Sequence, residues 1–333
     1  MHDTANCAAL AALALLTVVT ADTVSAQGTA RASAGDYPTK PVRMIVPLAP
    51  SGGSDIVGRM VALELFNHWG QAVVVDNRPG AGSTVGTSIA ARAPADGYTV
   101  LVSSSSIAIS PALYKNLDFD IKRDLAGVTL IASQPSILAV HSSVPAGSVK
   151  ELIALARAHP GKLTYASAGP GSATHLGTEL LKYTAGIDLL HIPYKSAGQA
   201  TSALLSGETQ ILLTNMASVL PHVRSGRIKA LGVSSLRRSP LAPDLPTVAE
   251  AGVHGFEYTT WYGMLIPAGT PRFIVNRLQA DVAYVIKTPQ LRERFAVQGL
   301  DTYGTSPAEF GIYLNTEIAK WDKVVRMAGV RAE

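Results

Sequence analysis

Short apolar runs alternate along the chain with longer segments in which apolar residues recur every three to four positions. Residues 42–46 form such a run, and residues 56–69 follow it with helical spacing. The same succession recurs at residues 71–76 and 84–93, and another apolar run lies at residues 98–102. Strands that alternate with helices predict right-handed βαβ units and a parallel sheet.

The rest of the chain continues this alternation and then becomes helical. Two apolar segments at residues 128–131 and 136–141 come first. Further strands are expected at residues 163–166, 189–193, 210–213, 228–234 and 259–267. Helices are expected at residues 149–159, 176–184, 199–205, 217–225, 245–252, 272–287, 290–298 and 307–327. The pattern predicts an α/β fold whose last part is helical.

The N-terminal segment has the pattern of a secretory signal. Its apolar core, residues 8–19, is too short for a stable membrane anchor, and Val24-Ser25-Ala26 forms a small-x-small cleavage site. Residues 27–36 are rich in Gly, Ala and Ser, which is typical of a flexible leader. We therefore expect residues 1–26 to be removed near Ala26 and the remaining chain to be exported as a soluble protein.

The composition argues against several classes of protein. A chain of 333 residues is long enough for about two domains, and 47% hydrophobic residues can build their cores. The one cysteine, Cys7, lies in the N-terminal segment, so neither an intrachain disulfide nor a cysteine metal cluster can form. The formal charge is +4, with no basic run. We expect no nucleic-acid partner, whereas a mildly basic exported protein can attract anions.

A loop rich in glycine and serine follows the first strand and precedes the first helix. Its residues are Pro50, Ser51, Gly52, Gly53, Ser54 and Asp55. The two glycines allow a close approach of the backbone to a ligand, and Ser54 or Asp55 can cap the helix. The free N–H groups of a first helical turn attract a negative group. An ordinary strand-to-helix turn is the alternative at this point.

A second loop of the same kind lies between the strand at residues 163–166 and the helix at residues 176–184. Its candidate residues are Gly169, Gly171, Ser172, Thr174 and His175. Two such helix N-termini suit one anionic group, so we expect both loops to lie around a ligand carboxylate. If that expectation fails, these residues only cap their helices.

Two other groups of residues are weaker candidates for a ligand site. Serines at positions 103–106 follow the third strand, at the edge where open α/β sheets bind ligands. A solvated loop is the alternative for these serines. Tyr258, Trp261 and Tyr262 form an aromatic patch, for which core packing and a ligand wall are the two interpretations.

Enzymatic chemistry finds little support in the sequence. There is no Walker loop, no His-Glu-x-x-His and no Gly-x-Ser-x-Gly motif, so no cofactor or metal is expected. Ser172 and His175 are three residues apart, but no acidic residue is placed to orient the histidine. His175 and His191 lack the spacing of metal ligands. An exported α/β hydrolase that uses Ser172 or Ser54 remains the alternative function.

Several short motifs occur in order along the chain and carry a family resemblance. They are Tyr37-Pro38, Pro41-Val42-Arg43, Pro47-Leu48-Ala49-Pro50, Val75-Asp76-Asn77-Arg78-Pro79-Gly80-Ala81-Gly82, Pro160-Gly161-Lys162-Leu163, Tyr165-Ala166-Ser167-Ala168-Gly169, His191-Ile192-Pro193-Tyr194-Lys195, Leu245-Pro246-Thr247-Val248-Ala249-Glu250-Ala251-Gly252 and Trp261-Tyr262-Gly263. From about Tyr37 to its C-terminus the chain resembles the extracytoplasmic solute receptors of the tripartite tricarboxylate transporter family, the Bug proteins.

This resemblance implies the two-domain, type II-like periplasmic-binding-protein fold. Each domain would be a mainly parallel sheet flanked by helices, with the ligand cleft between them. Domain 1 would comprise residues 37–139 and 260–333, and domain 2 would comprise residues 140–259. The chain would cross between them near residues 138–142 and 257–262, where a hinge is expected.

The resemblance also implies a function. The chain would be a non-enzymatic periplasmic receptor that closes on a small organic carboxylate, partly through ordered waters. It would present this ligand to the membrane subunits of a tripartite transporter or to a signalling partner. We expect a monomer without a cofactor.

The chain departs from the family pattern at positions that bear on the ligand. Leu48 stands where an aromatic residue is usual, and Ser51 lengthens the usual Pro-Gly-Gly of the first loop. Thr214 stands where the family usually has an aspartate, and Ser196 replaces a glycine. These differences predict a more polar, less negatively charged pocket. The residues expected to line its remainder are Leu48, Ser105, Tyr194, Thr214 and Trp261.

Overall fold

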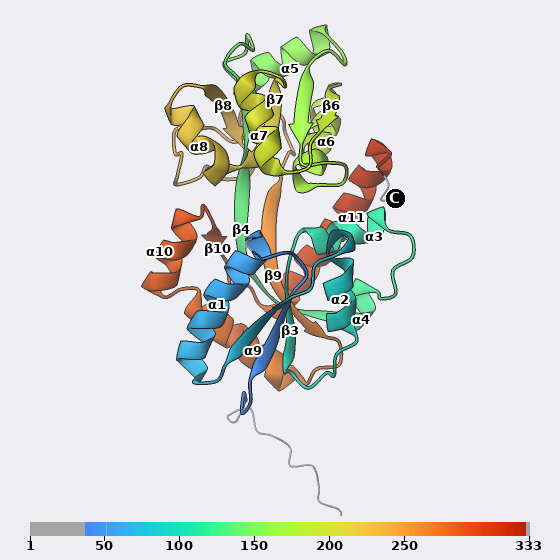
Figure 1. The fold of residues 1–333 in the computed structure, drawn as a ribbon, viewed down its shortest axis with the longest axis vertical. Coiled ribbons are helices and arrows are strands. Elements are labelled where there is room, and N and C mark those ends of the chain that lie inside the picture. Colours follow the sequence, from blue (N-terminus) through green and yellow to red (C-terminus); the bar gives the residue numbers. More distant parts are fainter. Residues whose placement is uncertain (1–36, 51, 331–333) are drawn as a thin grey trace, which may run out of the picture.

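The computed structural model describes residues 37–50 and 52–330, which form two lobes joined end to end (Figure 1). The lower lobe contains the beginning and most of the last part of the described chain, the upper lobe is formed by its middle part, and the C-terminal end reaches the upper lobe. The expected signal at residues 1–26, the leader at residues 27–36 and Ser51 lie outside the described residues. Within these ranges, no helix has the length and apolarity needed to span a membrane.

Each lobe is built around its own part of one mixed sheet. The lower sheet has the order β2(Val73–Asn77), β1(Val42–Val46), β3(Thr99–Ser104), β9(Thr259–Pro267) and β4(Leu125–His141), with β10(Asp301–Thr302) also pairing with β4. The upper sheet has the order β6(Leu190–Pro193), β5(Thr164–Ser167), β7(Ile211–Asn215) and β4, with β8(Ile228–Val233) also pairing with β4. The outer strands pair in parallel, as expected for βαβ units. The central strands β4 and β9 pair antiparallel with their neighbours.

Strand β4 is one strand of 17 residues, although the sequence indicated two separate segments. Its pairing contains register shifts at Gly127/Thr129 and Leu130/Ala132, which interrupt the alternation that marks a strand in sequence. β4 pairs with β9 as far as Pro135 and with β7 from Ser136 onward. The chain therefore passes between the lobes at this point, a few residues before the expected crossing near residues 138–142.

Helices cover the sheets of both lobes. The lower lobe has α1(Gly53–Trp69), the 3-10 turn η1(Ala81–Ser83), α2(Thr84–Ala91), α3(Ser106–Leu113), α4(Ile121–Asp124), α9(Arg272–Val285), α10(Pro289–Val297) and α11(Pro307–Ala328). The upper lobe has α5(Val149–Ala158), α6(Ala173–Ala185), α7(Ala197–Ser206) and α8(Met216–Arg224). The helix expected at residues 245–252 is wrong. The side chains of Thr247 and Glu250 each accept a hydrogen bond from the other residue's backbone N–H, and these two bonds close a single turn. The turn ends at Gly252, whose φ is 114°.

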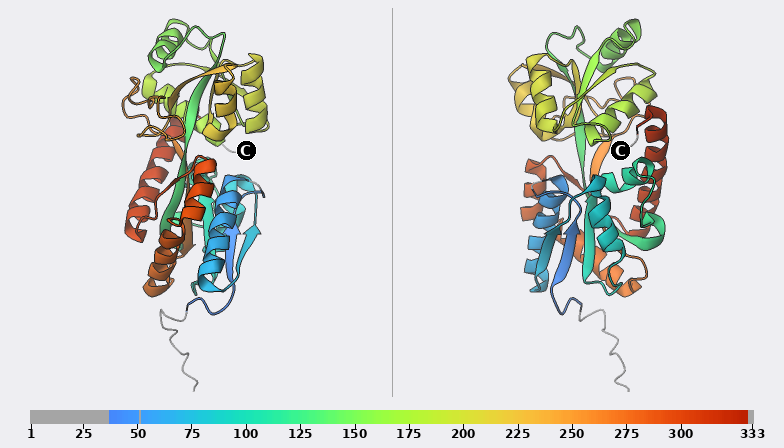
Figure 2. Two further views of the ribbon diagram at one scale, coloured as in Figure 1. Left: turned by 90° about the vertical axis from the view of Figure 1, so that its left-hand side faces the viewer. Right: turned by 45° about the vertical axis from the view of Figure 1, so that its right-hand side comes forward.

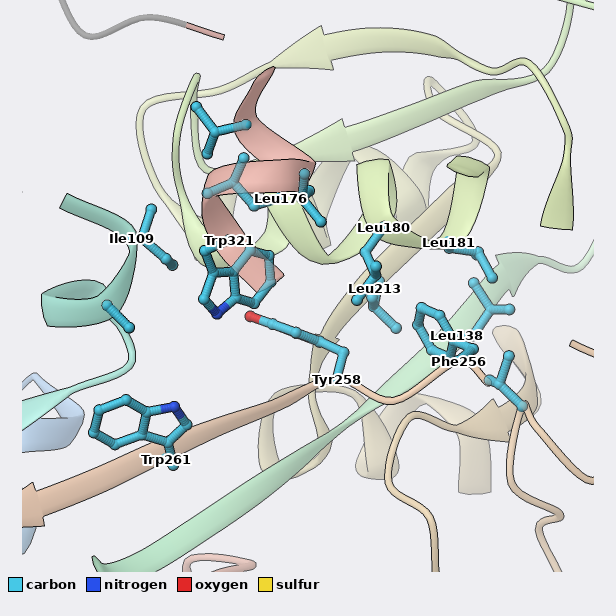
Figure 3. Close-up of a cluster of buried hydrophobic side chains, with 14 of the residues drawn as sticks. Ile109, Leu138, Leu176, Leu180, Leu181, Leu213, Phe256, Tyr258, Trp261 and Trp321 are labelled. Atoms are coloured by element: carbon cyan, nitrogen blue, oxygen red, sulfur yellow. The ribbon is translucent and has the colours of Figure 1, made fainter. Parts of the chain in front are cut away.

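Helix α11 runs along the lower lobe and reaches the upper lobe (Figures 1 and 2). Its Trp321 is fully buried, and the ring meets Tyr258 edge-on at a centroid distance of 5.9 Å. Figure 3 shows Trp321 between Ile109 of the lower lobe and Leu176 of α6. The hydrophobic core is therefore continuous from one lobe to the other along this helix.

Candidate functional site

The N-terminus of helix α1 is an uncapped helix end. Figure 1 shows that this end of α1 points toward the upper lobe. Gly52 is the N-cap residue, and no side chain accepts a hydrogen bond there. Ser54 and Asp55 lie inside the first turn, so neither is the cap that the sequence allowed. The N–H groups of Gly53 and Ser54 have no acceptor within the helix, and the positive end of the helix dipole lies at this point.

The loop before α1 is fastened to the end of strand β2. Asp55 is buried, and its carboxylate accepts hydrogen bonds from Asn77 Nδ2 at 2.9 Å and from Arg59 Nε at 3.0 Å. Asn77 Nδ2 also donates to the carbonyl oxygen of Leu48 at 3.1 Å. Leu48 is half-buried and Pro50 is exposed. Asp55 thus anchors the loop, and its charge is offset by Arg59.

Tyr262 lies against the first residue of α1. A Cβ atom added to Gly53 would lie 2.1 Å from the Tyr262 hydroxyl oxygen, so only glycine fits without a shift of one of them. Tyr262 is 5% exposed, and burial raises the pKa of its hydroxyl to about 12. The group therefore keeps its proton near neutral pH and can donate a hydrogen bond beside the free N–H groups of the helix.

Trp261 lies on the other face of β9, because successive side chains of a strand point to opposite faces. It is fully buried, its indole N–H donates to Glu317 at 2.9 Å, and its ring packs edge-on against Phe310. The expectation that Trp261 lines the ligand site is therefore corrected, since the side chain belongs to the core beside α11. Tyr262 is the residue of this pair that reaches a candidate loop.

Helix α6 of the upper lobe has a similar N-terminus, but here a side chain already accepts a hydrogen bond from one of the first backbone N–H groups. Ser172 is the N-cap, and its Oγ accepts the N–H of His175 at 3.3 Å. The N–H groups of Ala173 and Thr174, the first two helical residues, have no acceptor within the helix. This end of α6 can therefore bind an anion through two backbone donors and the helix dipole.

In the loop before α6, residues 167–172, backbone N–H groups donate hydrogen bonds to side chains of the same lobe. Gly169 N–H donates to Ser167 Oγ at 3.0 Å, and Gly171 N–H donates to His175 Nδ1 at 3.0 Å. The two glycines have φ angles of 104° and 73°, which favour glycine. In this structure they shape the loop, and their N–H groups are not free for a ligand.

His175 is a neutral, buried side chain in this arrangement. Burial, with a smaller contribution from neighbouring His191, lowers its pKa to about 4. Because Nδ1 accepts the Gly171 N–H, the single proton of the neutral ring lies on Nε2. His175 therefore supports the α6 loop from inside rather than forming an exposed base.

Four buried hydroxyl groups have no hydrogen-bond partner among the described residues: Ser54, Ser103, Thr209 and Thr214. Ser54 lies in the first turn of α1, whereas Ser103 and Thr214 each lie one residue before the end of a strand. Thr209 precedes β7 and lies at the opposite end of that strand. Buried hydroxyls are usually satisfied, so an unpartnered one calls for a water or a ligand. Ser54, Ser103 and Thr214 are at the sheet edge and helix end where α/β proteins bind ligands.

Ser105 and Tyr194 make other contacts. Ser105 is buried, and its N–H donates to the carbonyl oxygen of Trp261 at 3.0 Å. The Tyr194 hydroxyl donates to Glu208 at 2.8 Å, and burial together with this bond raises its pKa to about 12. Tyr194 contacts the α6 loop through its backbone, where its N–H donates to Ser167 O at 2.9 Å.

The geometry gives no support to a hydrolase. Ser54 Oγ has no base beside it, since it has no partner within the described part of the chain. Ser172 Oγ accepts a backbone N–H, and Nδ1 of His175 is occupied by Gly171. Residues 37–50 and 52–330 contain no group of three or more His, Cys, Asp or Glu side chains that could hold a metal ion.

The α6 loop also touches the lower lobe. A Cβ atom at Gly171 would lie 3.2 Å from Leu113 Cδ1, at the last residue of α3. The candidate donors of the two lobes are backbone N–H groups and hydroxyls, without an arginine or lysine among them. Such a set can bind an anion whose charge is stabilised by hydrogen bonds and helix dipoles.

Comparison with known proteins places the chain in a family. A family model described as "Tripartite tricarboxylate transporter family receptor" matches residues 57–330. The structure of Rpa4515 from R. palustris with adipate is 35% identical and has a TM-score of 0.75, covering 89% of this chain and 99% of that one. The periplasmic binding protein BugD is 33% identical with a TM-score of 0.72, covering 89% of this chain and 100% of BugD.

A third solved structure is MatC from Rhodopseudomonas palustris with bound malate. It is 29% identical with a TM-score of 0.71, and the match covers 87% of this chain and 100% of MatC. The agreement extends over both lobes and over nearly the whole length of each relative. These matches confirm the two-lobed α/β fold of the periplasmic binding proteins. This chain therefore belongs to the family of tripartite tricarboxylate transporter receptors, whose members are substrate-binding proteins.

Proposed function

We propose that this chain is a periplasmic receptor that binds a small organic carboxylate between its two lobes. The observation that carries the proposal is the pair of helix N-termini whose first backbone donors, at Gly53 and Ser54 of α1 and at Ala173 and Thr174 of α6, have no acceptor within their helices. The Tyr262 hydroxyl adds a neutral donor at the α1 end. Relatives with adipate and with malate support a carboxylate as the ligand class.

The proposed biological role follows from the family. The exported protein, cleaved near Ala26, would deliver its ligand to the membrane subunits of a tripartite transporter and would act without catalysis as a monomer. The proposed ligand contacts are the donors named above together with Ser172 and the unpartnered hydroxyls of Ser103 and Thr214. Ser51, which lies outside the described residues, remains a proposed contact of the α1 loop.

Ligand-stripped protein should bind small dicarboxylates in isothermal titration calorimetry, and it should not prefer amino diacids. Thr214 offers no charge to an ammonium group, and the carboxylate of Asp55 is already paired with Arg59. A hydrogen bond to a charged group is worth about 1.5–3 kcal/mol, so aspartate lacks that gain here. Succinate, malate and adipate are measured against aspartate and glutamate. Tighter binding of aspartate than of succinate would contradict the pocket chemistry, and no heat from any acid would contradict the function.

Ligand binding should close the two lobes around strands β4 and β9. Strand β4 passes between the lobes at Pro135, which pairs with Thr259, the residue at which the chain enters β9 from the upper lobe, so the bend is proposed there. A ligand that touches both lobes stabilises the closed form alone and shifts the population toward it. Small-angle X-ray scattering at saturating ligand should show a smaller radius of gyration than the free protein. An unchanged distance distribution at saturation would indicate a rigid pair of lobes.

A further inference from the structure

Two histidine rings lie stacked beneath the α6 loop. The rings of His175 and His191 have a centroid distance of 4.1 Å and an interplanar angle of 10°. The Tyr165 ring is nearly parallel to both, with centroid distances of 4.8 Å to His191 and 6.3 Å to His175. His191 Nε2 lies 2.6 Å from Ser167 Oγ, the atom that accepts the Gly169 N–H. Each imidazole therefore connects to one end of the same short loop.

Side chains accept hydrogen bonds from three amides of this loop, and a backbone turn holds the amide of Ser172, which donates to Gly169 O at 3.1 Å. Ala168 N–H donates to Thr174 Oγ1 at 2.8 Å, Gly169 N–H to Ser167 Oγ, and Gly171 N–H to His175 Nδ1. Gly171 is the residue that touches Leu113 of the lower lobe. The imidazole of His175 thus fixes the part of the loop that faces the other lobe and directly precedes the free N–H groups of α6.

We propose that neutral His175 is a positioning residue of the carboxylate site, holding Gly171 so that the N-terminus of α6 is presented to the ligand, and that protonation of His175 releases this loop. The proposal rests on the proposed function, because it assigns the α6 end as one half of the ligand site. A proton on Nδ1 turns the acceptor into a donor that faces the Gly171 donor. The same proton places a positive charge against the stacked ring of His191.

Burial keeps the imidazoles of the pair neutral, while the charge of Glu179 acts to raise the pKa of both rings and that of Lys182 acts to lower it. Burial also lowers the pKa of His191 below its ordinary value. Glu179 accepts the Tyr165 hydroxyl at 2.6 Å and pairs with Lys182 at 2.9 Å. Lys182 is also 3.7 Å from Asp188, so its charge is shared by two carboxylates.

Water has access to the histidine pair. A cavity of about 440 Å³ borders the two rings, and its other lining includes the C-terminal end of α11. Protons can therefore reach the imidazoles without unfolding of the lobe. When the loop is ordered, the pKa of His175 is lowered to about 4. When the loop opens, the pKa of His175 returns to its ordinary value of 6.5. The ordered form of the loop is therefore favoured above pH 6.5, and this preference is lost as the pH falls from 6.5 toward 4.

Two substitutions of the same residue test this role. In His175→Asn the amide oxygen can take the place of Nδ1, but it cannot be protonated. In His175→Phe a ring of similar size can still stack, but the acceptor is gone. With adipate and malate as probes at about pH 7.5, Kd of His175→Phe should rise about tenfold or more, because a buried donor is left unpaired. Kd of His175→Asn should stay within about threefold of the wild type.

The pH profile separates positioning from general packing. The ratio of the wild-type Kd to the His175→Asn Kd should rise as the pH falls from 6.5 toward 4, and the comparison cancels titration of the ligand itself. A constant ratio over this range would overturn the proposal. So would equal Kd values for His175→Phe and the wild type near neutral pH.

A readout without ligand keeps this inference distinct from the proposed function. Hydrogen exchange of the Gly171 amide, followed by NMR, should be slow in the wild type and in His175→Asn and at least about tenfold faster in His175→Phe. This difference is expected whether or not any acid in the panel binds. Equal exchange rates in the three proteins would overturn the positioning role, while absence of binding by the wild type would overturn only the carboxylate function.

Discussion

Replacing Gly53 with alanine should weaken carboxylate binding by about 100-fold or more. The added Cβ would lie 2.1 Å from the Tyr262 hydroxyl oxygen and 2.8 Å from its Cζ atom, so either the tyrosine or the first turn of α1 must move. The change therefore disturbs the Tyr262 donor and the helix N–H groups together. One or two hydrogen bonds to a charged group, at about 1.5–3 kcal/mol each, account for the loss.

The control for this substitution is Gly311→Ala in α11. A Cβ atom at Gly311 meets no other atom within 4 Å, so it should leave binding unchanged and raise the free energy of unfolding by up to about 1 kcal/mol. Calorimetry with the ligand identified for the wild type gives Kd for both variants, and circular dichroism confirms that both are folded. Binding by Gly53→Ala within about threefold of the wild type would show that the α1 end takes no part in the site.

Replacing Trp321 with alanine should lower the free energy of unfolding by about 3–5 kcal/mol. The side chain is fully buried, packs against Tyr258 and donates its indole N–H to Glu317 at 3.1 Å. Its removal leaves a cavity where α11 meets the upper lobe, and it deprives Glu317 of one of its two indole donors. Urea unfolding followed by circular dichroism measures the change.

The matched control for Trp321 lies on the same helix. Ile312 is 70% exposed, so Ile312→Ala should change the free energy of unfolding by no more than about 0.5 kcal/mol. This comparison separates the packing of Trp321 from the helix propensity of α11. A loss below about 1 kcal/mol for Trp321→Ala would mean that the contact between α11 and the upper lobe contributes little to stability.

The outer βαβ units could be predicted from the sequence because each one is local. A run of apolar residues at Val42–Val46 followed by helical spacing specifies both elements without knowledge of the rest of the chain. Strand β4 could not be predicted as one strand, since its bulges and Pro135 interrupt the alternation. Its continuity comes from partners that are distant in sequence, because β9 pairs with its first part and β7 and β8 pair with its second part.

The two candidate loops were predictable from glycine and serine, but their free donors were not. The orientation of the His175 ring decides whether the Gly171 N–H is available, and that orientation depends on packing against His191. The sequence indicated one aromatic patch that contains Trp261 and Tyr262, although strand alternation places the two side chains on opposite faces of β9. It could not say which face meets α1, because that depends on α11 covering the other one.

Strand β9 lies between β3 and β4, although it is synthesised after every strand of the upper lobe. A chain that emerges N-terminus first therefore exposes unpaired edges of β3 and β4 until residues 259–267 arrive. The upper lobe has its own strands, β4 to β8, before that moment and can complete their pairing earlier. Vectorial emergence therefore allows the strands of the middle of the chain to pair before β9 closes the sheet of the lower lobe. A pause before Thr259 would prolong the interval in which the exposed edges can aggregate.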